Sequence, residues 1–177
     1  MVLDTSTSGV CRTHNPYKVA RSKGVPMSES QSGSEALLSE IRHIGVVVRD
    51  VEETAKYFAE KLGVSFTVRE REKSGTLRGA PMKYKAKLAH APLGAVTLEL
   101  LQTVEGTAHF DEFLATHGEG IHHIAIGSPE PLDAEIEKWQ RRGVQPVQID
   151  RTAPGEGTAY MDVPGCMVEL LCNKRYR

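Results

Sequence analysis

Ile41-Arg42-His43-Ile44-Gly45 is a short stretch that recurs in similar form as Ile121-His122-His123-Ile124-Ala125, about eighty residues further along the chain. Both copies place a histidine at the start of an apolar segment. Each copy is followed by an acidic, helix-like stretch that ends in Gly-Val, at residues 51–64 and 132–144. The repetition indicates two copies of one supersecondary unit.

Each unit closes on an apolar strand that carries a single carboxylate. The two strands are Val96-Thr97-Leu98-Glu99-Leu100-Leu101 and Met167-Val168-Glu169-Leu170-Leu171. An unpaired carboxylate in a strand that is buried on both faces costs several kcal/mol. A matched pair of such glutamates, each accompanied by a matched histidine, therefore indicates a function. Together the units can place four metal-binding groups around a single point.

The composition excludes several classes of partner. The 177 residues contain 22 Lys and Arg against 23 Asp and Glu, and the formal net charge of -1 provides no field that would attract nucleic acid or an anionic membrane. No apolar run approaches the roughly 20 residues of a transmembrane helix. Cys11, Cys166 and Cys172 lack metal-type spacing, and the last two flank one short strand in a poor disulfide geometry. We therefore expect reduced thiols and a cytoplasmic protein.

Residues 1–40 differ from the rest of the chain. They are rich in Ser, Thr and Gly and lack a periodic apolar face, so they cannot bury enough surface to offset the entropy cost of ordering. We expect a disordered leader without a function. Its basic residues weakly resemble a transit peptide, but Pro16 and Pro26 interrupt any amphipathic helix. An alternative is that translation starts at Met27.

Residues 41–177 are expected to form one domain, with module one at residues 41–104. Its helix should begin after Asp50, because this N-cap and Glu53 make a capping-box pattern, and it should end at Gly63. Its strands are predicted at residues 43–48, 66–72, 82–90 and 96–101, with a turn around residues 75–81.

Module two, residues 121–172, repeats the βαβββ order. Pro131 suits the first turn of its helix, and Gly143 ends the helix. Its strands are predicted at residues 123–127, 144–149, 158–162 and 167–172. The linker, residues 105–120, contains a short helix whose inward residues are expected to be Phe110, Phe113 and Leu114.

This arrangement predicts an α+β fold. One helix covers one face of each four-stranded sheet, so the second face would leave apolar surface in water unless the two sheets meet. Paired about a pseudo-twofold axis, the modules form an incomplete barrel around a metal-binding cleft. His43 and His123 begin equivalent strands, and Glu99 and Glu169 lie in equivalent last strands, so all four enter the cleft.

The candidate metal ligands are these two histidines and two glutamates. Imidazole and carboxylate ligands suit Zn²⁺, Co²⁺, Ni²⁺, Fe²⁺ or Mn²⁺, and four of them on an octahedral ion leave two positions for water or substrate oxygens. The alternative for any single histidine at a strand start is a structural role. Side chains alternate along a strand, so His122 and His123 should point to opposite faces. Alignment of the repeats pairs His123 with His43, which makes His123 the ligand and His122 a core or supporting group.

These segments resemble the vicinal oxygen chelate superfamily (glyoxalase, bleomycin resistance and extradiol dioxygenase proteins), whose paired βαβββ modules enclose a divalent metal. Within it, the chain is similar to methylmalonyl-CoA epimerases. The similar segments are residues 42–48, 60–63, 98–101, 113–125 and 168–171. The segment 113–125, a helix that leads into the double histidine, is the most specific of them.

The resemblance implies a reaction as well as a fold. The metal ion, whether Co, Zn, Ni, Mn or Fe, would chelate two oxygens of a small acyl-CoA or thiol-adduct substrate. Its Lewis acidity lowers the cost of removing the proton between them. Glu169 is implied as the catalytic base. The implied protein is a metal-dependent isomerase or epimerase and a homodimer.

The chain also departs from the epimerase pattern. Some epimerases carry a second catalytic glutamate on the strand that corresponds to residues 82–90. Here that strand has no acid and carries three alternating lysines, Lys83, Lys85 and Lys87. We interpret the lysines as a solvated face, with binding of CoA phosphates as an alternative. Glu70 or Glu72 is the candidate replacement for the missing acid. The loop before the last strand is also shortened, to residues 163–165. Because of these departures, the substrate can be either methylmalonyl-CoA or a different compound.

Three other functions remain as alternatives. A glyoxalase I-like lactoylglutathione lyase uses a His/Glu/His/Glu set, which this chain matches, although the His-His doublet favours an epimerase. An extradiol-type dioxygenase needs two histidines and one glutamate, and Glu99 argues against it. A non-catalytic binding protein on the same scaffold usually lacks the metal ligands.

Overall fold

The structure, a computed structural model, describes residues 36–176. The elements in this range are β1 (Ile41–Val47), α1 (Val51–Leu62), β2 (Thr67–Leu77), β3 (Ala80–Leu93), β4 (Val96–Gly106), α2 (His109–His117), β5 (Gly120–Ser128), α3 (Leu132–Gln140), β6 (Pro146–Ala153), β7 (Glu156–Val163), β8 (Cys166–Cys172) and a 3-10 turn, Lys174–Tyr176. None of the described helices is long and apolar enough to cross a membrane. Residues 1–35 of the expected leader lie outside the described residues.

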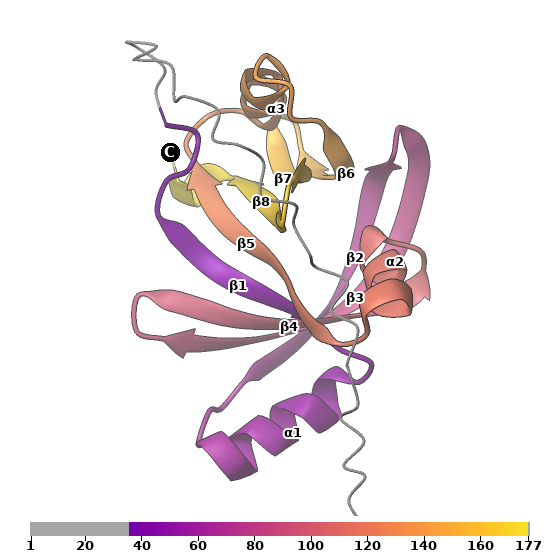
Figure 1. Cartoon of the computed structure of the whole chain (residues 1–177), viewed down its shortest axis with the longest axis vertical. Coiled ribbons are helices and arrows are strands. Elements are labelled where there is room, and N and C mark those ends of the chain that lie inside the picture. The colour runs from indigo at the N-terminus through magenta and orange to yellow at the C-terminus, as the bar shows by residue number, and fades with distance from the viewer. Residues whose placement is uncertain (1–35, 177) are drawn as a thin grey trace, which may run out of the picture. The chain divides into compact units, whose positions relative to one another are not determined.

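The eight strands form two βαβββ modules, as predicted, in the α+β arrangement of Figure 1. Around the barrel the strands follow the order β1-β4-β3-β2-β6-β7-β8-β5. In each module the first and last strands run parallel, and the two first strands, β1 and β5, pair antiparallel. The paired first strands therefore join the modules in the symmetric manner that the repeat predicts.

The ring of strands is closed, where the sequence predicted an incomplete barrel. Residues 75–77 of β2 pair with residues 148–150 of β6. This contact requires glycine at position 75, because a Cβ atom there would lie 1.8 Å from the carbonyl oxygen of Ile149. The turn expected around residues 75–81 is present but shorter than predicted. The strands continue to Leu77, and the turn consists of Arg78 and Gly79, both with positive φ (49° and 83°), which is typical of a tight hairpin.

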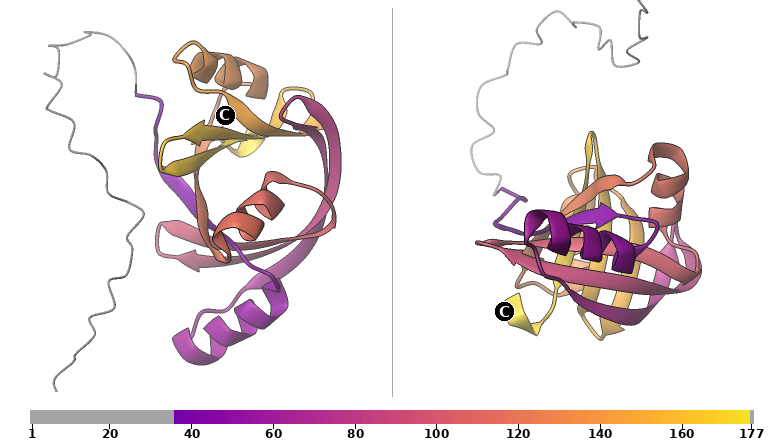
Figure 2. Two further views of the ribbon diagram at one scale, coloured as in Figure 1. Left: turned by 45° about the vertical axis from the view of Figure 1, so that its right-hand side comes forward. Right: turned by 90° about the horizontal axis from the view of Figure 1, so that it is seen from below.

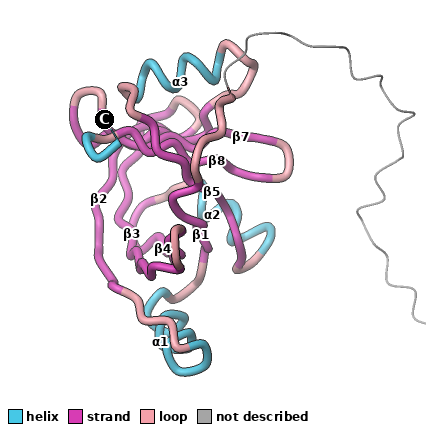
Figure 3. Tube along the Cα trace, turned by 90° about the vertical axis from the view of Figure 1, so that its left-hand side faces the viewer, coloured by secondary structure: helices cyan, strands magenta, loops and turns pink. Residues whose placement is uncertain are grey.

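The helices cover different parts of the barrel. α1 packs on β3 and β4, and α3 packs on β7 and β8, so these helices lie at opposite ends of the domain (Figure 3). α2 lies across an opening of the ring in the left view of Figure 2. Its residue Phe110 is buried among Val47, Tyr84 and Tyr160 of the barrel interior, while Phe113 and Leu114 are partly buried beside them, as predicted.

The predicted helix ends of module one are confirmed. The Asp50 side chain accepts a hydrogen bond from the backbone N–H of Glu53 at 2.9 Å, and Gly63 adopts the left-handed conformation with φ 68°. Two residues that precede β1 also contact the domain. Leu37 packs against the buried apolar cluster that contains Ile136 and Trp139 of α3. The Ser39 hydroxyl donates to the carbonyl of Gly127 at 3.3 Å.

Candidate metal centre

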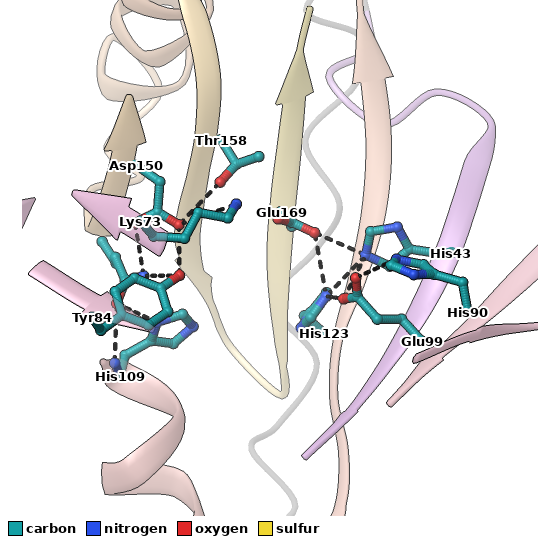
Figure 4. A network of polar contacts seen from close by, with 11 residues as sticks. His43, Lys73, Tyr84, His90, Glu99, His109, His123, Asp150, Thr158 and Glu169 are labelled. Carbon is teal, nitrogen blue, oxygen red and sulfur yellow. Dashed lines mark hydrogen bonds and ion pairs between the residues drawn. The ribbon is translucent and has the colours of Figure 1, made fainter. Parts of the chain in front are cut away.

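Strand register brings the two histidines and the two glutamates to one place inside the barrel. Gly45, two residues after His43, pairs with Glu99. Ala125, two residues after His123, pairs with Glu169 in the same way. Because β1 and β5 are themselves paired, the two equivalent sets face each other across this pair. Figure 4 shows the four side chains converging from β1, β4, β5 and β8.

The four side chains lie close enough to share one ion. One ligand atom from each lies within 4.8 Å of all the others. The His43 and His123 Nε2 atoms are 3.1 Å apart, and Oε2 of Glu169 is 2.8 Å and 3.3 Å from them. Oε2 of Glu99 is 3.4 Å and 3.5 Å from the same nitrogens. Neighbouring ligands about 2.1 Å from a divalent ion are themselves roughly 3 to 3.5 Å apart, so these separations fit.

The chemistry of the donor set also fits a metal. Oε2 of Glu169 is fully buried, and its 2.8 Å contact with Nε2 of His43 does not have regular hydrogen-bond geometry. Two imidazole nitrogens pointing at each other also need a shared cation or proton between them. A divalent ion would satisfy all these atoms together, since two imidazoles and two carboxylates suit Zn²⁺, Co²⁺, Ni²⁺, Mn²⁺ or Fe²⁺.

The histidines and glutamates of the site shift one another's pKa values. Burial lowers the pKa of His123, but contacts with Glu169 and Glu99 outweigh it and raise this pKa to about 9. The pKa of His43 is also raised, because contact with Glu169 outweighs its burial. Burial raises the pKa of Glu99, but His123 and His90 outweigh it and lower the pKa to about 2. Burial also raises the pKa of Glu169, but contacts with His123 and His43 outweigh it and hold this pKa well below its usual range. The carboxylates are therefore ionised at neutral pH.

The orientation of the His122 side chain differs from the prediction. The pairing of β1 with β5 shifts register between Gly45 and Val46, so residue 122 is an extra residue on β5. Such a bulge interrupts the alternation of side chains. The His122 and His123 rings both contact Phe110 and Tyr160, and they do not point to opposite faces of the strand.

The bulge gives His122 a supporting position. Its Nδ1 lies 3.0 Å from Nδ1 of His123. Burial, with the nearby His109 and His123, lowers the pKa of His122 to about 2, so this ring is neutral and can accept the Nδ1 proton of His123. With a divalent ion in place of the Nε2 proton, this contact would hold the His123 ring with Nε2 toward the ion.

Sequence reasoning missed His90. Its Nε2 lies 2.8 Å from Oε1 of Glu99, the oxygen that does not face the histidine pair. His90 is opposite Glu99 in the β3–β4 hairpin. The turn at residues 94–95 was the available signal, because a tight turn there places residue 90 opposite residue 99.

A second buried polar network was also missed. Tyr84 donates to Oδ2 of Asp150 at 2.8 Å, and the Gln148 amide donates to Oδ1 of Asp150 at 3.0 Å and to the Tyr84 hydroxyl at 3.1 Å. His109 contacts Oε1 of Gln148 through both its backbone N–H and its Nδ1. Lys73 lies 3.8 Å from Asp150, on the left of Figure 4. The network ties Tyr84 of β3 and His109 of α2 to β6, the strand that closes the barrel.

The candidate replacement acids are outside the site. Glu70 pairs with Lys85 at 2.8 Å, and Glu72 pairs with Lys83 at 3.3 Å, on the exposed face of the β2–β3 hairpin. Lys87 pairs with Glu52 of α1. The lysines therefore form a solvated, ion-paired face, as interpreted from the sequence. The open pocket lined by His43, Glu99 and Glu169, of about 330 Å³, has these two glutamates as its acids.

Comparison with known proteins decides the family. The family model of the glyoxalase/bleomycin resistance protein/dioxygenase superfamily matches residues 42–161. The chain belongs to this superfamily. No curated protein sequence matches the chain.

Solved structures support the superfamily fold. A hypothetical protein from Bacillus halodurans is similar with 24% identity and a TM-score of 0.56, over 76% of this chain and 94% of that one. A methylmalonyl-CoA epimerase in complex with methylmalonyl-CoA has 22% identity and a TM-score of 0.57, over 79% and 98%. The epimerase from Mycobacterium tuberculosis has 20% identity and a TM-score of 0.56, over 80% and 92%. At these identities the similarity establishes the superfamily fold alone.

Proposed function

We propose that this protein is a metal-dependent isomerase or epimerase that removes a proton next to a carbonyl group. The observation that carries the proposal is the convergence of His43, Glu99, His123 and Glu169 on one point, with the buried Oε2 of Glu169 lacking a regular hydrogen bond. The similarity to methylmalonyl-CoA epimerases supports the reaction class.

The four converging residues would hold the metal. When bound, a divalent ion supplies Lewis acidity that favours negative charge on a substrate carbonyl oxygen. His122 sets the tautomer of His123, and His90 binds the outer oxygen of Glu99. Both contacts orient ligands before substrate arrives, which is the usual role of residues behind a metal ligand.

Glu169 is the proposed base. It is buried and ionised, and it belongs to β8, across the site from Glu99 on β4. A carboxylate that is held still beside the substrate carbon can take the proton without the cost of reorganising water. With Glu70 and Glu72 on the outer face, the acids that line the pocket are Glu99 and Glu169 alone among the described residues. We assign proton removal to Glu169 and leave Glu99 as a ligand that His90 holds.

The proposed substrate is a small acyl-CoA or thiol adduct with a second oxygen close to its carbonyl. Two such oxygens would complete an octahedral ion that has four protein ligands. Methylmalonyl-CoA is one compound of this class, and it is the compound bound to the structurally similar epimerase.

A glyoxalase I-like lactoylglutathione lyase is the second candidate. The observation in its favour is that Glu99 and Glu169 both contact the two histidines. These four residues make the His/Glu/His/Glu set that such an enzyme uses. It also moves a proton next to a carbonyl, so the same experiment applies with a hemithioacetal in place of an acyl-CoA.

The test is incorporation of solvent deuterium at the α-carbon of acyl-CoA and hemithioacetal substrates. Wild type loaded with Co²⁺, Zn²⁺, Ni²⁺, Mn²⁺ or Fe²⁺ should exchange one of these. Glu169→Gln should lower exchange by orders of magnitude, because an amide is too weak a base. Glu105→Gln, a change on the exposed end of β4, is the matched control and should behave as wild type. Oxygen consumption with catechols by the Fe²⁺-loaded protein would contradict the proposal. Metal binding without exchange of any of these substrates would favour a binding protein.

A further inference from the structure

Charged side chains on the β2–β3 hairpin are sorted by face. The outer face carries Glu70 and Glu72, and both carboxylates are paired with lysines of β3. The residues that alternate with them on β2 are Arg69, Arg71 and Lys73. The pairing of β2 with β3 has no register shift, so these three cations share the inner face. This is the face of the hairpin that also carries Leu88, Ala86 and Tyr84 of the interior cluster around Phe110. Lys73 is ion-paired with Asp150 there.

Two of these cations line a pocket. Arg69 and Arg71 lie with Arg175, from the segment after β8, around an open cavity of about 460 Å³. Its other lining residues are Thr67, Leu88, His90, Pro92 and Thr97. No carboxylate is among the lining residues, so the three guanidinium groups meet no opposite charge there.

The arginine pocket is continuous with the candidate metal centre. His90, Thr97 and Arg175 line both this cavity and the one that contains His43, Glu99 and Glu169. His90 marks the boundary, because its Nε2 contacts Glu99 while its ring also borders the arginine pocket. One molecule can therefore reach both places.

These arginines have no carboxylate partner within residues 36–176. Arg71 donates to the backbone carbonyl of Glu70 at 3.1 Å, and no ion pair involves Arg69, Arg71 or Arg175 in the described part of the chain. The lysines on the outer face of the same hairpin are ion-paired. A guanidinium offers a planar fork of donors that matches phosphate oxygens, and it is less strongly hydrated than an ammonium.

We propose that the pocket lined by Arg69, Arg71 and Arg175 binds a phosphate group of the substrate whose carbonyl lies at the metal residues. The position of the carbonyl rests on the proposed function, but the phosphate site does not need the metal. The phosphate has two possible sources, the nucleotide part of coenzyme A or a phosphate ester on a small acid.

The test uses inorganic phosphate and unacylated coenzyme A as probes of the metal-free, full-length protein, with binding followed by calorimetry at fixed ionic strength. The Arg69→Ala/Arg71→Ala double variant should weaken binding of a probe at least tenfold. Lys83→Ala/Lys85→Ala removes the same charge from the opposite face of the same hairpin, and it should change binding less than twofold. This control separates a specific site from general attraction.

Each outcome has a distinct meaning. Coenzyme A binding much more tightly than phosphate, with both sensitive to the arginines, supports the proposal and assigns the site to coenzyme phosphates. Comparable binding of the two probes supports it and assigns the site to a phosphate ester on a small acid. Absence of binding by both, or equal weakening in the two double variants, overturns it. Phosphate binding that persists while the metal-loaded protein shows no deuterium exchange would refute the proposed reaction and leave this site standing.

Discussion

The backbone of Gly45 lies directly against the ring of His123. A Cβ atom on Gly45 would be 2.0 Å from Cε1 and 2.2 Å from Nε2 of that ring. Gly45 also pairs with Glu99 on its other side, so this one residue separates two of the four candidate ligands. The missing side chain of Gly45 is what lets the His123 ring reach the centre of the site.

Gly45→Ala should therefore displace His123 and abolish most metal binding. The added methyl group cannot be accommodated unless the buried ring moves, so a fall in the thermal midpoint should accompany the loss. Gly120→Ala is the matched control, because a Cβ atom on this glycine of β5 would meet nothing within 4 Å. Metal content and thermal midpoint of both variants check the prediction. Wild-type metal affinity in Gly45→Ala would show that His123 is not a ligand.

His90→Ala should weaken metal affinity by about tenfold or more, because Glu99 loses the partner that holds its outer oxygen. His90→Gln retains a donor and should recover part of the affinity. Competition with a chromogenic chelator measures both values. His117→Ala, at the exposed end of α2, serves as the control and should leave the affinity unchanged. Equal metal affinities in wild type and His90→Ala would show that His90 does not support the metal site.

The metal-free domain should lose stability in acid partly through His109. Burial lowers the pKa of this histidine from 6.5 to about 4, and its Nε2 has no hydrogen-bond partner among the described residues. As the pH falls below 6.5, the unfolded chain binds a proton that the folded domain takes up only near pH 4, so the free energy of unfolding decreases through this window. Between pH 6.5 and about pH 4.5 the loss from this group is about 2 to 3 kcal/mol.

His109→Phe should flatten that dependence, since the new ring does not titrate and Gln148 Oε1 still accepts the backbone N–H of residue 109. Urea unfolding of metal-free protein at the two pH values gives the comparison. His117→Phe provides the control for an exposed histidine. Parallel pH profiles for wild type and His109→Phe would show that His109 is charged in the folded domain.

The repeat predicted the features that depend on local pattern. The two modules follow from matched strand and helix signals, and the convergence of His43, Glu99, His123 and Glu169 follows from their equivalent places in paired modules. The Asp50 and Gly63 signals located the ends of α1 because capping is a local interaction.

The remaining features depend on contacts between distant segments. Closure of the barrel rests on the approach of Gly75 to Ile149, and no local pattern shows which strands of the two modules will meet. The bulge at His122 arises from the register of β5 against β1, so strict alternation predicted the wrong orientation for that side chain. His90 enters the site through cross-strand pairing with Glu99, which becomes visible only when the turn is placed to the residue.

The most direct test of the central claim is elemental analysis of purified wild type, His123→Ala and His122→Ala after equilibration with one divalent metal. Wild type should hold about one ion per chain, because four ligand atoms surround a single point. His123→Ala should lose most of the metal, while His122→Ala should retain it with lower affinity, since His122 only orients the His123 ring. Retention of metal by His123→Ala together with its loss from His122→Ala would contradict the assignment of the site.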